Sequence, residues 1–475
     1  MSAPVVVIGG GVSGLALARR LPASVPVLVL EAERILGGQV RTERDGEFLL
    51  EGGADTLLTQ KPWALELCRS LGLAGELDGV APRPGGTEIL HRGRLVPVPD
   101  GFLMMAPTRV APVLRSPLFS PWGKARLLME PLVPRRRSDD DDESLASFVT
   151  RRFGREALER IAEPVVAGLY TADADRLSLR LTMPRFLDLE SKEGSVTRGL
   201  KKTLRGGGTR PFGHGTGGGA FVALRSGMGR LVEALAEGLP IRTGVRVAGI
   251  RRVDSRPLTV ESEGGERIEA SAVVFACPAY ETARILRGFH AEAAAELDEL
   301  PHASSAVVHL IYRAEDVRAP LRSFGFFVPR TERSPILACS FVSQKFRGRA
   351  PEGFTVLRVF MGGATRPEVL DHDDQGLAEV AHRALVPVLR LTAGPERARV
   401  HRHPRAMPQF APGSAARLSR LVERVEAHEG LYVVGGVAGA VGIPDCVRVA
   451  EATADRIVEK TRAQRAPRVA YQANQ

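Results

Sequence analysis

A glycine-rich turn near the N-terminus, VVVIGGGVSG at residues 5–14, constrains the fold of this chain more than any other feature. The four apolar residues before the turn predict a short strand that is buried on both faces. Gly9, Gly11 and Gly14 have the G-x-G-x-x-G spacing, which permits a tight turn, approach of a pyrophosphate and packing of a helix on the strand. The pattern alone also fits an ordinary strand–helix turn, so its surroundings must decide between the two interpretations.

The residues after the turn favour a dinucleotide-binding unit. Residues 15–21 have helical character and end at Pro22, and the N-terminus of such a helix would face a diphosphate. A second apolar run, residues 25–30, ends on Glu31, where an acid would hold a ribose hydroxyl. Strand, turn, helix, second strand and terminal acid occur in the expected order, and together they predict an α/β fold.

Composition places the chain among ordinary globular proteins. Its 475 residues suffice for two to four domains at about 100–200 residues each. The net charge of +10 favours anionic ligands or surfaces, although an arginine-rich solvated surface is the simpler explanation, and 5% aromatic residues give no nucleic-acid-binding pattern. The four cysteines form no C-x-x-C pair, which indicates reduced thiols in a cytoplasmic protein and no metal site. The sequence also predicts neither a signal peptide nor an apolar run of about 18 residues that would span a bilayer.

Two further glycine-rich stretches extend the predicted cofactor site. The segment ERILGGQVRT after Glu31 contains Gly37 and Gly38, which permit close backbone approach, and Arg41, which can neutralise phosphate. Near the C-terminus, GLYVVGGVAGAVGIPDC predicts a strand, a double glycine and a helix with Pro444 in its first turn. Backbone N–H groups at that helix start would stabilise negative charge on a bound ring. Because both ends of the chain build this site, everything between them is inserted.

These stretches resemble the flavin amine-oxidase-like superfamily, in which the acid is followed by Arg, Gly-Gly, and Arg with Ser or Thr. The chain matches this pattern at Arg34, Gly37, Gly38, Arg41 and Thr42. It departs from the pattern at Gln39, where relatives usually carry Arg. The resemblance implies FAD as the cofactor, bound by a discontinuous Rossmann-like domain, rather than a nicotinamide nucleotide.

Within this superfamily the chain resembles the oxygen-dependent porphyrinogen oxidases of haem biosynthesis. The resemblance is carried by EPVVAGLYTADADRLSLRLTMPRF from Glu163, SFGFFVPR from Ser323, APEGFTVLRVFMGGA from Ala350, MPQF from Met407 and VGIPDC from Val441. It implies that a porphyrinogen gives hydride to the flavin, which O2 reoxidises with release of hydrogen peroxide, so no catalytic side chain is expected. The strings look closer to Gram-positive-type enzymes, so coproporphyrinogen III is the favoured substrate and protoporphyrinogen IX the alternative.

The resemblance also implies which residues form the site. The expected FAD contacts are Gly9, Gly11, Val12, Ser13, Gly14, Glu31, Ala32, Gly37, Gly38, Gln39, Arg41, Gly53, Ala54, Val245, Gly436, Val441, Gly442 and Ile443. The expected substrate contacts are Asp55, Lys61, Gly168, Tyr170, Phe324, Phe327 and Met361. The apolar members of this set would wall the macrocycle, although any one of them alone more often belongs to an ordinary core. Lys61 would meet a propionate, whereas Asp55 would need a basic partner such as Arg92 or Arg94.

The predicted fold is α/β, with a mainly helical domain and an α+β substrate domain inserted into the FAD-binding domain. We expect the FAD-binding domain at residues 1–91, 206–290 and 412–465, the helical domain at 92–205, the substrate domain at 291–411 and a tail at 466–475. A glycine-rich connector is expected within 198–219. Apolar and basic residues at 102–119 suggest that the helical domain contacts a membrane, on the cytoplasmic face, although a plain helical core explains them as well. A homodimer is a further hypothesis.

Three rival functions are weighed against this prediction. Phytoene-desaturase-like enzymes share the opening fold, but the His-Pro-Gly-Gly type of C-terminal stretch is missing. Amine oxidases need an aromatic cage at the flavin, and residues 437–443 contain no aromatic side chain. A non-catalytic flavin- or porphyrin-binding carrier stays open on sequence alone.

Overall fold

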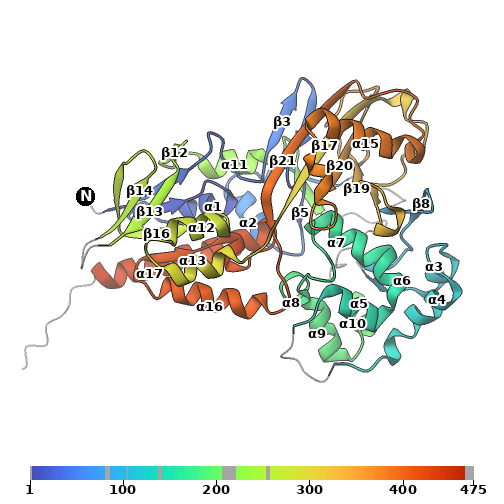
Figure 1. Cartoon of the computed structure of the whole chain (residues 1–475), viewed down its shortest axis with the longest axis horizontal. Coiled ribbons are helices and arrows are strands. Elements are labelled where there is room, and N and C mark those ends of the chain that lie inside the picture. Colours follow the sequence, from blue (N-terminus) through green and yellow to red (C-terminus); the bar gives the residue numbers. More distant parts are fainter. Residues whose placement is uncertain are drawn as a thin grey trace, which may run out of the picture.

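The computed structural model describes residues 3–80, 86–103, 105–136, 142–205, 221–252 and 257–465, with side chains up to residue 463 (Figure 1). The predicted tail at 466–475 and most of the predicted glycine-rich connector lie outside the described residues. Three units follow from the strand pairing and the cores, and we propose them as the division of the chain. They are a parallel-sheet unit (3–80, 221–300 and 412–465), a seven-stranded unit (86–97 and 301–411) and a helical unit (98–205).

The parallel-sheet unit is built on five parallel strands. Their order is β12 (Ile241–Thr243), β2 (Val27–Glu31), β1 (Val5–Ile8), β16 (Ala272–Phe275) and β22 (Leu431–Val433). The strand β1 is buried along its whole length because helices cover both faces of the sheet. The strand β22 pairs with β16 although about 150 residues separate them, so the expectation of a discontinuous α/β domain is confirmed.

Each face of this sheet has its own apolar core. One core contains side chains of α1 (Val12–Arg20), α2 (Trp63–Ser70), α11 (Gly229–Ala236) and α17 (Ile443–Arg465). The other contains side chains of α12 (Ala279–Leu286), α13 (Ala291–Asp298), α16 (Ser414–Glu426), β13 (Val247–Arg251), β14 (Leu258–Ser262) and β15 (Arg267–Ala270). A small sheet of β5 (Leu57–Leu58), β11 (Phe221–Leu224) and β6 (Leu77–Gly79) lies in the same unit.

The seven-stranded unit has the strand order β21 (Arg397–Pro408), β17 (His302–Arg313), β20 (Phe354–Gly362), β19 (Ile336–Phe341), β18 (Gly325–Phe327), β7 (Glu88–His91) and β8 (Arg94–Pro97). Helix α15 (Asp374–Leu389) covers one face, and α14 (Val342–Lys345) follows β19. The expected boundary at residues 91/92 falls inside the β7–β8 hairpin, which pairs with β18 and therefore belongs to this sheet. The local sequence pattern of the hairpin could not reveal that β18 is its pairing partner.

The helical unit contains α3 (Val110–Arg115), α4 (Pro121–Leu128), α5 (Leu145–Phe153), α6 (Arg155–Ala157), α7 (Glu163–Tyr170), α8 (Leu179–Thr182), α9 (Pro184–Glu193) and α10 (Val196–Arg205). Before α3, the described residues of this unit form the short strands β9 (Phe102–Leu103) and β10 (Ala106–Pro107). A buried ion pair of Arg152 with Glu130 fixes the core, and Glu130 also accepts the backbone N–H of Val196 at 3.0 Å. The residues 158–162 before α7 form a π-helical turn, a feature that is frequent near functional sites.

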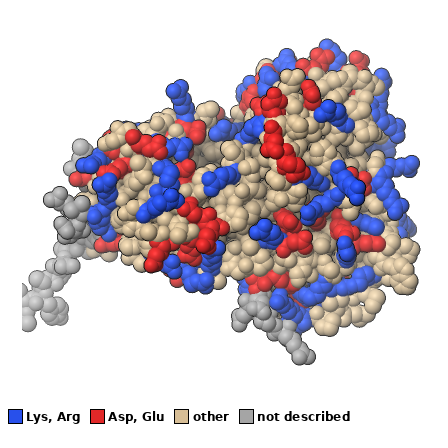
Figure 2. Space-filling view, viewed as in Figure 1, with Lys and Arg blue, Asp and Glu red and all other residues tan. Residues whose placement is uncertain are grey.

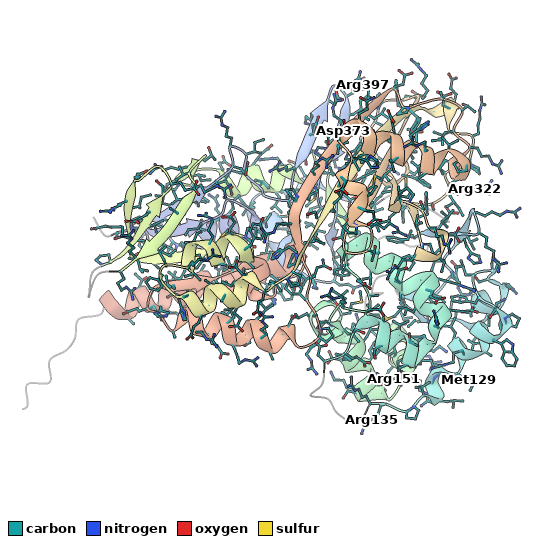
Figure 3. All side chains as sticks on the ribbon, viewed as in Figure 1. Met129, Arg135, Arg151, Arg322, Asp373 and Arg397 are labelled. Atoms are coloured by element: carbon teal, nitrogen blue, oxygen red, sulfur yellow. The ribbon has the colours of Figure 1, made fainter. Side chains whose placement is uncertain are left out.

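A charged hairpin joins two of the units. Strands β3 (Thr42–Asp45) and β4 (Phe48–Glu51) lie beside the edge strand β21 (Figure 1). Asp45 accepts a hydrogen bond from Arg397 at 3.0 Å and forms an ion pair with Arg399 at 2.8 Å, and Arg397 is labelled in Figure 3. These ion pairs cover an edge that would otherwise present a 12-residue strand to other chains.

Candidate functional site

The N-terminal glycine turn has the geometry that its spacing predicts. Gly9 has φ +117°, and a Cβ on it would lie 2.7 Å from the carbonyl oxygen of Ala276. A Cβ on Gly14 would lie 2.0 Å from the oxygen of Gly9, so only glycine lets α1 pack this closely on β1. A Cβ on Gly11, in contrast, would meet no atom within 4 Å among the described residues. The backbone at Gly11 is therefore open to a ligand.

Glu31 lies beside this turn at the end of β2. Its carboxylate accepts the backbone N–H of Gly10 at 2.6 Å and that of Glu33 at 2.8 Å. Val245 donates its N–H to the backbone oxygen of Glu31 at 2.9 Å, and Ala32 is half-buried next to it. The expected contacts to the adenosine part of the cofactor thus lie together.

The second glycine loop closes over the first. Gly37 donates to the oxygen of Gly10 at 2.9 Å, and a Cβ on Gly38 (φ +58°) would lie 3.6 Å from the Cα of Gly11. Arg41 donates to the oxygen of Gly38 at 3.1 Å. The side chain of Gln39, at the position where relatives usually have Arg, reaches the oxygen of Ala406 at the end of β21 at 2.5 Å.

The third segment, residues 52–55, passes directly under this loop. A Cβ on Gly53 would lie 1.6 Å from the oxygen of Gln39, which excludes any larger residue there. Ala54 is exposed although Asp55 beside it is buried. Ala54 is therefore accessible next to the point where Gly53 meets the second glycine loop.

The C-terminal segment completes the arrangement from the other end of the chain. A Cβ on Gly435 would lie 3.1 Å from Oγ of Ser13, and Ser13 also hydrogen-bonds the thiol of Cys446. The start of α17 is therefore adjacent to the start of α1, and Gly442 (φ +83°) is exposed just before it. The remaining expected contacts of this region, Val12, Gly436, Val441 and Ile443, lie in the same two segments.

Four glycine-containing segments, two of which lead into helices, thus converge on one region, where free N–H groups favour an anionic group. A long dinucleotide needs a diphosphate site, an acid for the ribose and backbone that a flat ring can approach. The residues in place supply all three, so the site fits FAD.

Lys61 lies near the C-terminal segment and is already paired. Its ammonium group forms an ion pair with Asp445 in the first turn of α17. Burial, together with the negative charge of Asp445, raises the pKa of Tyr170 to about 12, so its hydroxyl is neutral at physiological pH. Lys61, Asp445 and Tyr170 form one cluster, in which Asp445 offsets the positive charge expected to bind a propionate.

The structure brings Gly168 and Phe327 together. A Cβ on Gly168 would lie 2.5 Å from two ring carbons of Phe327, so the glycine lets α7 pack flat against β18. Tyr170 packs against the same core, as does Phe360 of β20. We call this set, Gly168, Tyr170, Phe327 and Phe360, the α7 interface.

Met361 and Phe324 are not part of the α7 interface. Met361 is fully buried in the core under α15, with Phe326, because alternate residues of a strand face opposite sides of a sheet. Phe324 is half-buried just before β18 and outside both cores. Sequence reasoning missed Phe360, the neighbour of Met361, since alternation shows that two faces exist but not which face meets α7.

Asp55 forms ion pairs within the protein. It is buried and accepts from Lys345 at 2.8 Å and from Arg358 at 3.1 Å, so its partners are not Arg92 or Arg94. Burial alone would raise the pKa of Asp55, but the Lys345 and Arg358 cations outweigh it and hold the pKa well below its ordinary value. These contacts give no support to a substrate role.

Comparison with known proteins gives a consistent result. The sequence profile of the family described as flavin containing amine oxidoreductase matches residues 12–458. The coproporphyrinogen III oxidase of Bacillus subtilis (strain 168) is 32% identical over 470 residues, which cover 93% of this chain and 95% of the relative. Protoporphyrinogen oxidase 1, chloroplastic, of Arabidopsis thaliana is 28% identical over 478 residues, which cover 94% and 87%.

Solved structures agree with this result. A crystal structure from Exiguobacterium sp. 255-15, named as a candidate protoporphyrinogen oxidase, has a TM-score of 0.85 at 28% identity and covers 97% of this chain and 99% of its own. Cyclohexylamine oxidase from Brevibacterium oxydans, at 19% identity with a TM-score of 0.72 and coverage of 97% and 100%, shares the fold.

Proposed function

Because the chain belongs to the flavin-containing amine oxidoreductases and uses FAD, we propose that it oxidises a porphyrinogen to the porphyrin in haem biosynthesis. Coproporphyrinogen III is the proposed substrate and protoporphyrinogen IX the alternative. The observation that carries the proposal is similarity over more than nine-tenths of the chain to an enzyme that bears the first name. The flavin supplies the hydride acceptor, and O2 is the proposed final oxidant, with release of hydrogen peroxide.

The residues of this chain supply binding and exclusion of water rather than chemistry. In the α7 interface Phe327 is buried, but Tyr170 and Phe360 are only partly buried, and such aromatic side chains suit a flat apolar macrocycle. The neutral hydroxyl of Tyr170 can hydrogen-bond without adding charge. Since Asp445 offsets Lys61, the charge argument for coproporphyrinogen is weaker than the sequence implied, and the preference rests on the relatives.

The deciding experiment measures both porphyrinogens side by side with purified, FAD-loaded protein. We expect porphyrin fluorescence and O2 uptake to rise together, and kcat/KM to be higher for coproporphyrinogen III. A clear preference for protoporphyrinogen IX would reverse the substrate assignment. Protein that holds FAD but leaves both substrates at the uncatalysed rate would identify a carrier instead. FAD-stripped protein serves as the control.

We also propose that the helical unit contacts an anionic membrane surface. Its described exposed large apolar side chains are Leu169 and a group within residues 110–132, namely Val110, Leu114, Trp122, Met129 and Leu132, of which Trp122 is 85% exposed. Arg109, Arg115 and Lys124 are close by in sequence, and Figure 2 shows uncharged surface bordered by basic residues where Figure 1 places this unit. Met129 and Arg135 mark the same end of the molecule in Figure 3.

The sequence pointed to residues 102–119 for this contact, but Phe102 and Phe119 are buried and stack on each other with centroids 5.9 Å apart. The contact therefore involves residues 110–132. Among the described residues, no helix combines the length and the apolar character needed to cross a bilayer.

Vesicle flotation tests this contact. We expect binding to anionic vesicles at low salt, weaker binding at physiological ionic strength, and none to zwitterionic vesicles, because surface attraction is screened over about 8–10 Å. Trp122→Ser should reduce binding. If the protein does not float with anionic vesicles at low salt, the proposed membrane contact is wrong.

A further inference from the structure

The backbone at residues 52–53 is held from behind by two side chains of the seven-stranded unit. The carbonyl of Gly52 accepts from Nε2 of His403, on β21, at 2.7 Å. The carbonyl of Gly53 accepts from Nη2 of Arg358, on β20. Since a carbonyl can only accept, Nε2 of His403 carries the proton. Both are hydrogen bonds from side chains to the backbone and not part of the backbone pairing within a sheet.

Both ends of this segment are anchored as well. The carboxylate of Glu51 accepts from Arg349 at 2.6 Å and from the backbone N–H of Met228 at 2.8 Å. At the other end, Asp55 accepts from Lys345 and Arg358. Arg358 therefore bridges the Gly53 carbonyl and the Asp55 carboxylate, and the peptide planes between them have little freedom to rotate.

These contacts of Arg358 and His403 with the segment, which we call the clamp, fix the direction of the neighbouring N–H groups. In a trans peptide the C=O and N–H bonds are antiparallel, and all described peptide bonds are trans. The N–H of Ala54 is therefore directed away from Arg358, and that of Gly53 away from His403. Neither N–H donates to an acceptor among the described residues. Ala54 is exposed, and Gly53 beside it lies against the glycine loop at Gln39, so the N–H of Ala54 lies close to the FAD site.

The clamp also carries charge. Arg358 and Lys345 are two cations against the single carboxylate of Asp55, and the pair of Arg349 with Glu51 is neutral. Burial lowers the pKa of His403 below its ordinary value, so this imidazole is uncharged at neutral pH. One net positive charge therefore lies behind the segment, in buried surroundings where screening is weak.

We propose that Arg358 is a positioning residue for the flavin, which it serves by aiming the Ala54 N–H at the cofactor and by placing positive charge behind it. Asp55 partly neutralises that positive charge. Positive charge and N–H donors favour the reduced, anionic flavin over the oxidised, neutral one, and so raise its midpoint potential. The proposal rests on the flavin assignment and not on the porphyrinogen.

Two substitutions of opposite sign test this role by the midpoint potential of the bound flavin, measured without substrate. Arg358→Gln removes a positive charge and should lower the potential. Asp55→Asn removes a negative charge and should raise it. A role in folding alone would not produce shifts of opposite sign. Unchanged potentials, or shifts in the same direction, would overturn the proposal, whatever the protein does with porphyrinogens.

Two further variants complete the experiment. Arg358→Lys keeps the charge but cannot bridge Gly53 and Asp55, so the Kd for FAD should rise about tenfold, or about 1.4 kcal/mol. An unchanged Kd would contradict the positioning role even if Arg358→Gln fails to fold. Arg151→Gln, which breaks ion pairs of the helical unit (Figure 3), is the matched control and should leave the flavin potential unchanged.

Discussion

At the residue scale, Glu31 combines two tasks in one carboxylate. It already holds the N–H groups of Gly10 and Glu33, and its remaining lone pairs stay available to a ribose. Charge-assisted hydrogen bonds contribute about 1.5–3 kcal/mol each, so Glu31→Ala should raise the Kd for FAD about 10- to 100-fold. Equilibrium dialysis measures this, with Glu31→Gln as an intermediate control. If the Glu31→Ala variant keeps all of its FAD through dialysis, Glu31 does not bind the ribose.

Glu163, at the start of α7, makes stability depend on pH. Burial raises its pKa to about 7, and the nearby Arg330 and Arg366 only partly offset this. Between the ordinary value of 4.5 and about 7 the folded state keeps a proton that the unfolded state has lost, so stability falls as pH rises. Glu163→Gln should match the wild type at pH 5 and be more stable at pH 8, by on the order of 1–3 kcal/mol.

Urea unfolding at the two pH values measures this difference. Glu190→Gln is the control with the opposite sign, because its ion pair with Arg151 lowers the pKa of Glu190 despite burial. Glu190→Gln should therefore lose stability at pH 8. An equal effect of Glu163→Gln at both pH values would show that Glu163 is charged throughout.

The turn geometry at Gly14 could be predicted from sequence because it is local. A Cβ on Gly14 would lie 2.0 Å from the oxygen of Gly9, so the contact that requires glycine there lies within a few residues. The partners of Asp55 were missed for the opposite reason, since Lys345 lies 290 residues away. No spacing rule links such residues, and only the packing of two units brings them together.

At the scale of elements, the close packing of helix α7 depends on a glycine, which has no side-chain methyl group. Gly168→Ala would place a Cβ against the ring of Phe327, and overpacking of this kind costs about 1–3 kcal/mol. We expect a lower melting temperature and slower porphyrinogen turnover with FAD binding unchanged. Phe327→Leu in the same chain should recover part of the stability. Gly288→Ala, with no atom within 4 Å, is the matched control and should be close to neutral.

The strands illustrate what periodicity predicts and what it leaves open. In strand β20, alternation places Phe360 and Met361 on opposite sides of the sheet. Which side meets α7 depends on the placement of another unit, so the sequence favoured Met361. A mainly helical domain was predicted at residues 92–205, but the π-helical turn before α7 was not, because it has no distinct period.

At the scale of the whole molecule, cofactor binding should hold together segments that are distant in the sequence. Residues near positions 10, 38, 54, 245 and 442 meet at one site, so FAD bridges segments that unfolding would separate. Free FAD at 100 times its Kd should stabilise the protein by about 2.7 kcal/mol. Thermal melts of stripped and reconstituted protein measure this, and Glu31→Ala should show a smaller shift at the same FAD concentration. Identical melting temperatures would contradict the bridging role.

The pairing of β22 with β16, and of α17 with α1, has a consequence for protein synthesis. The first βα unit leaves the ribosome early, but the strand and helix that complete its sheet emerge more than 400 residues later. The helical unit, whose residues are contiguous, can fold while the flavin site is still open. Flavin loading is therefore a late, post-translational event, and a nascent or truncated chain that ends before residue 431 should stay colourless. Yellow colour thus reports a chain translated through α17.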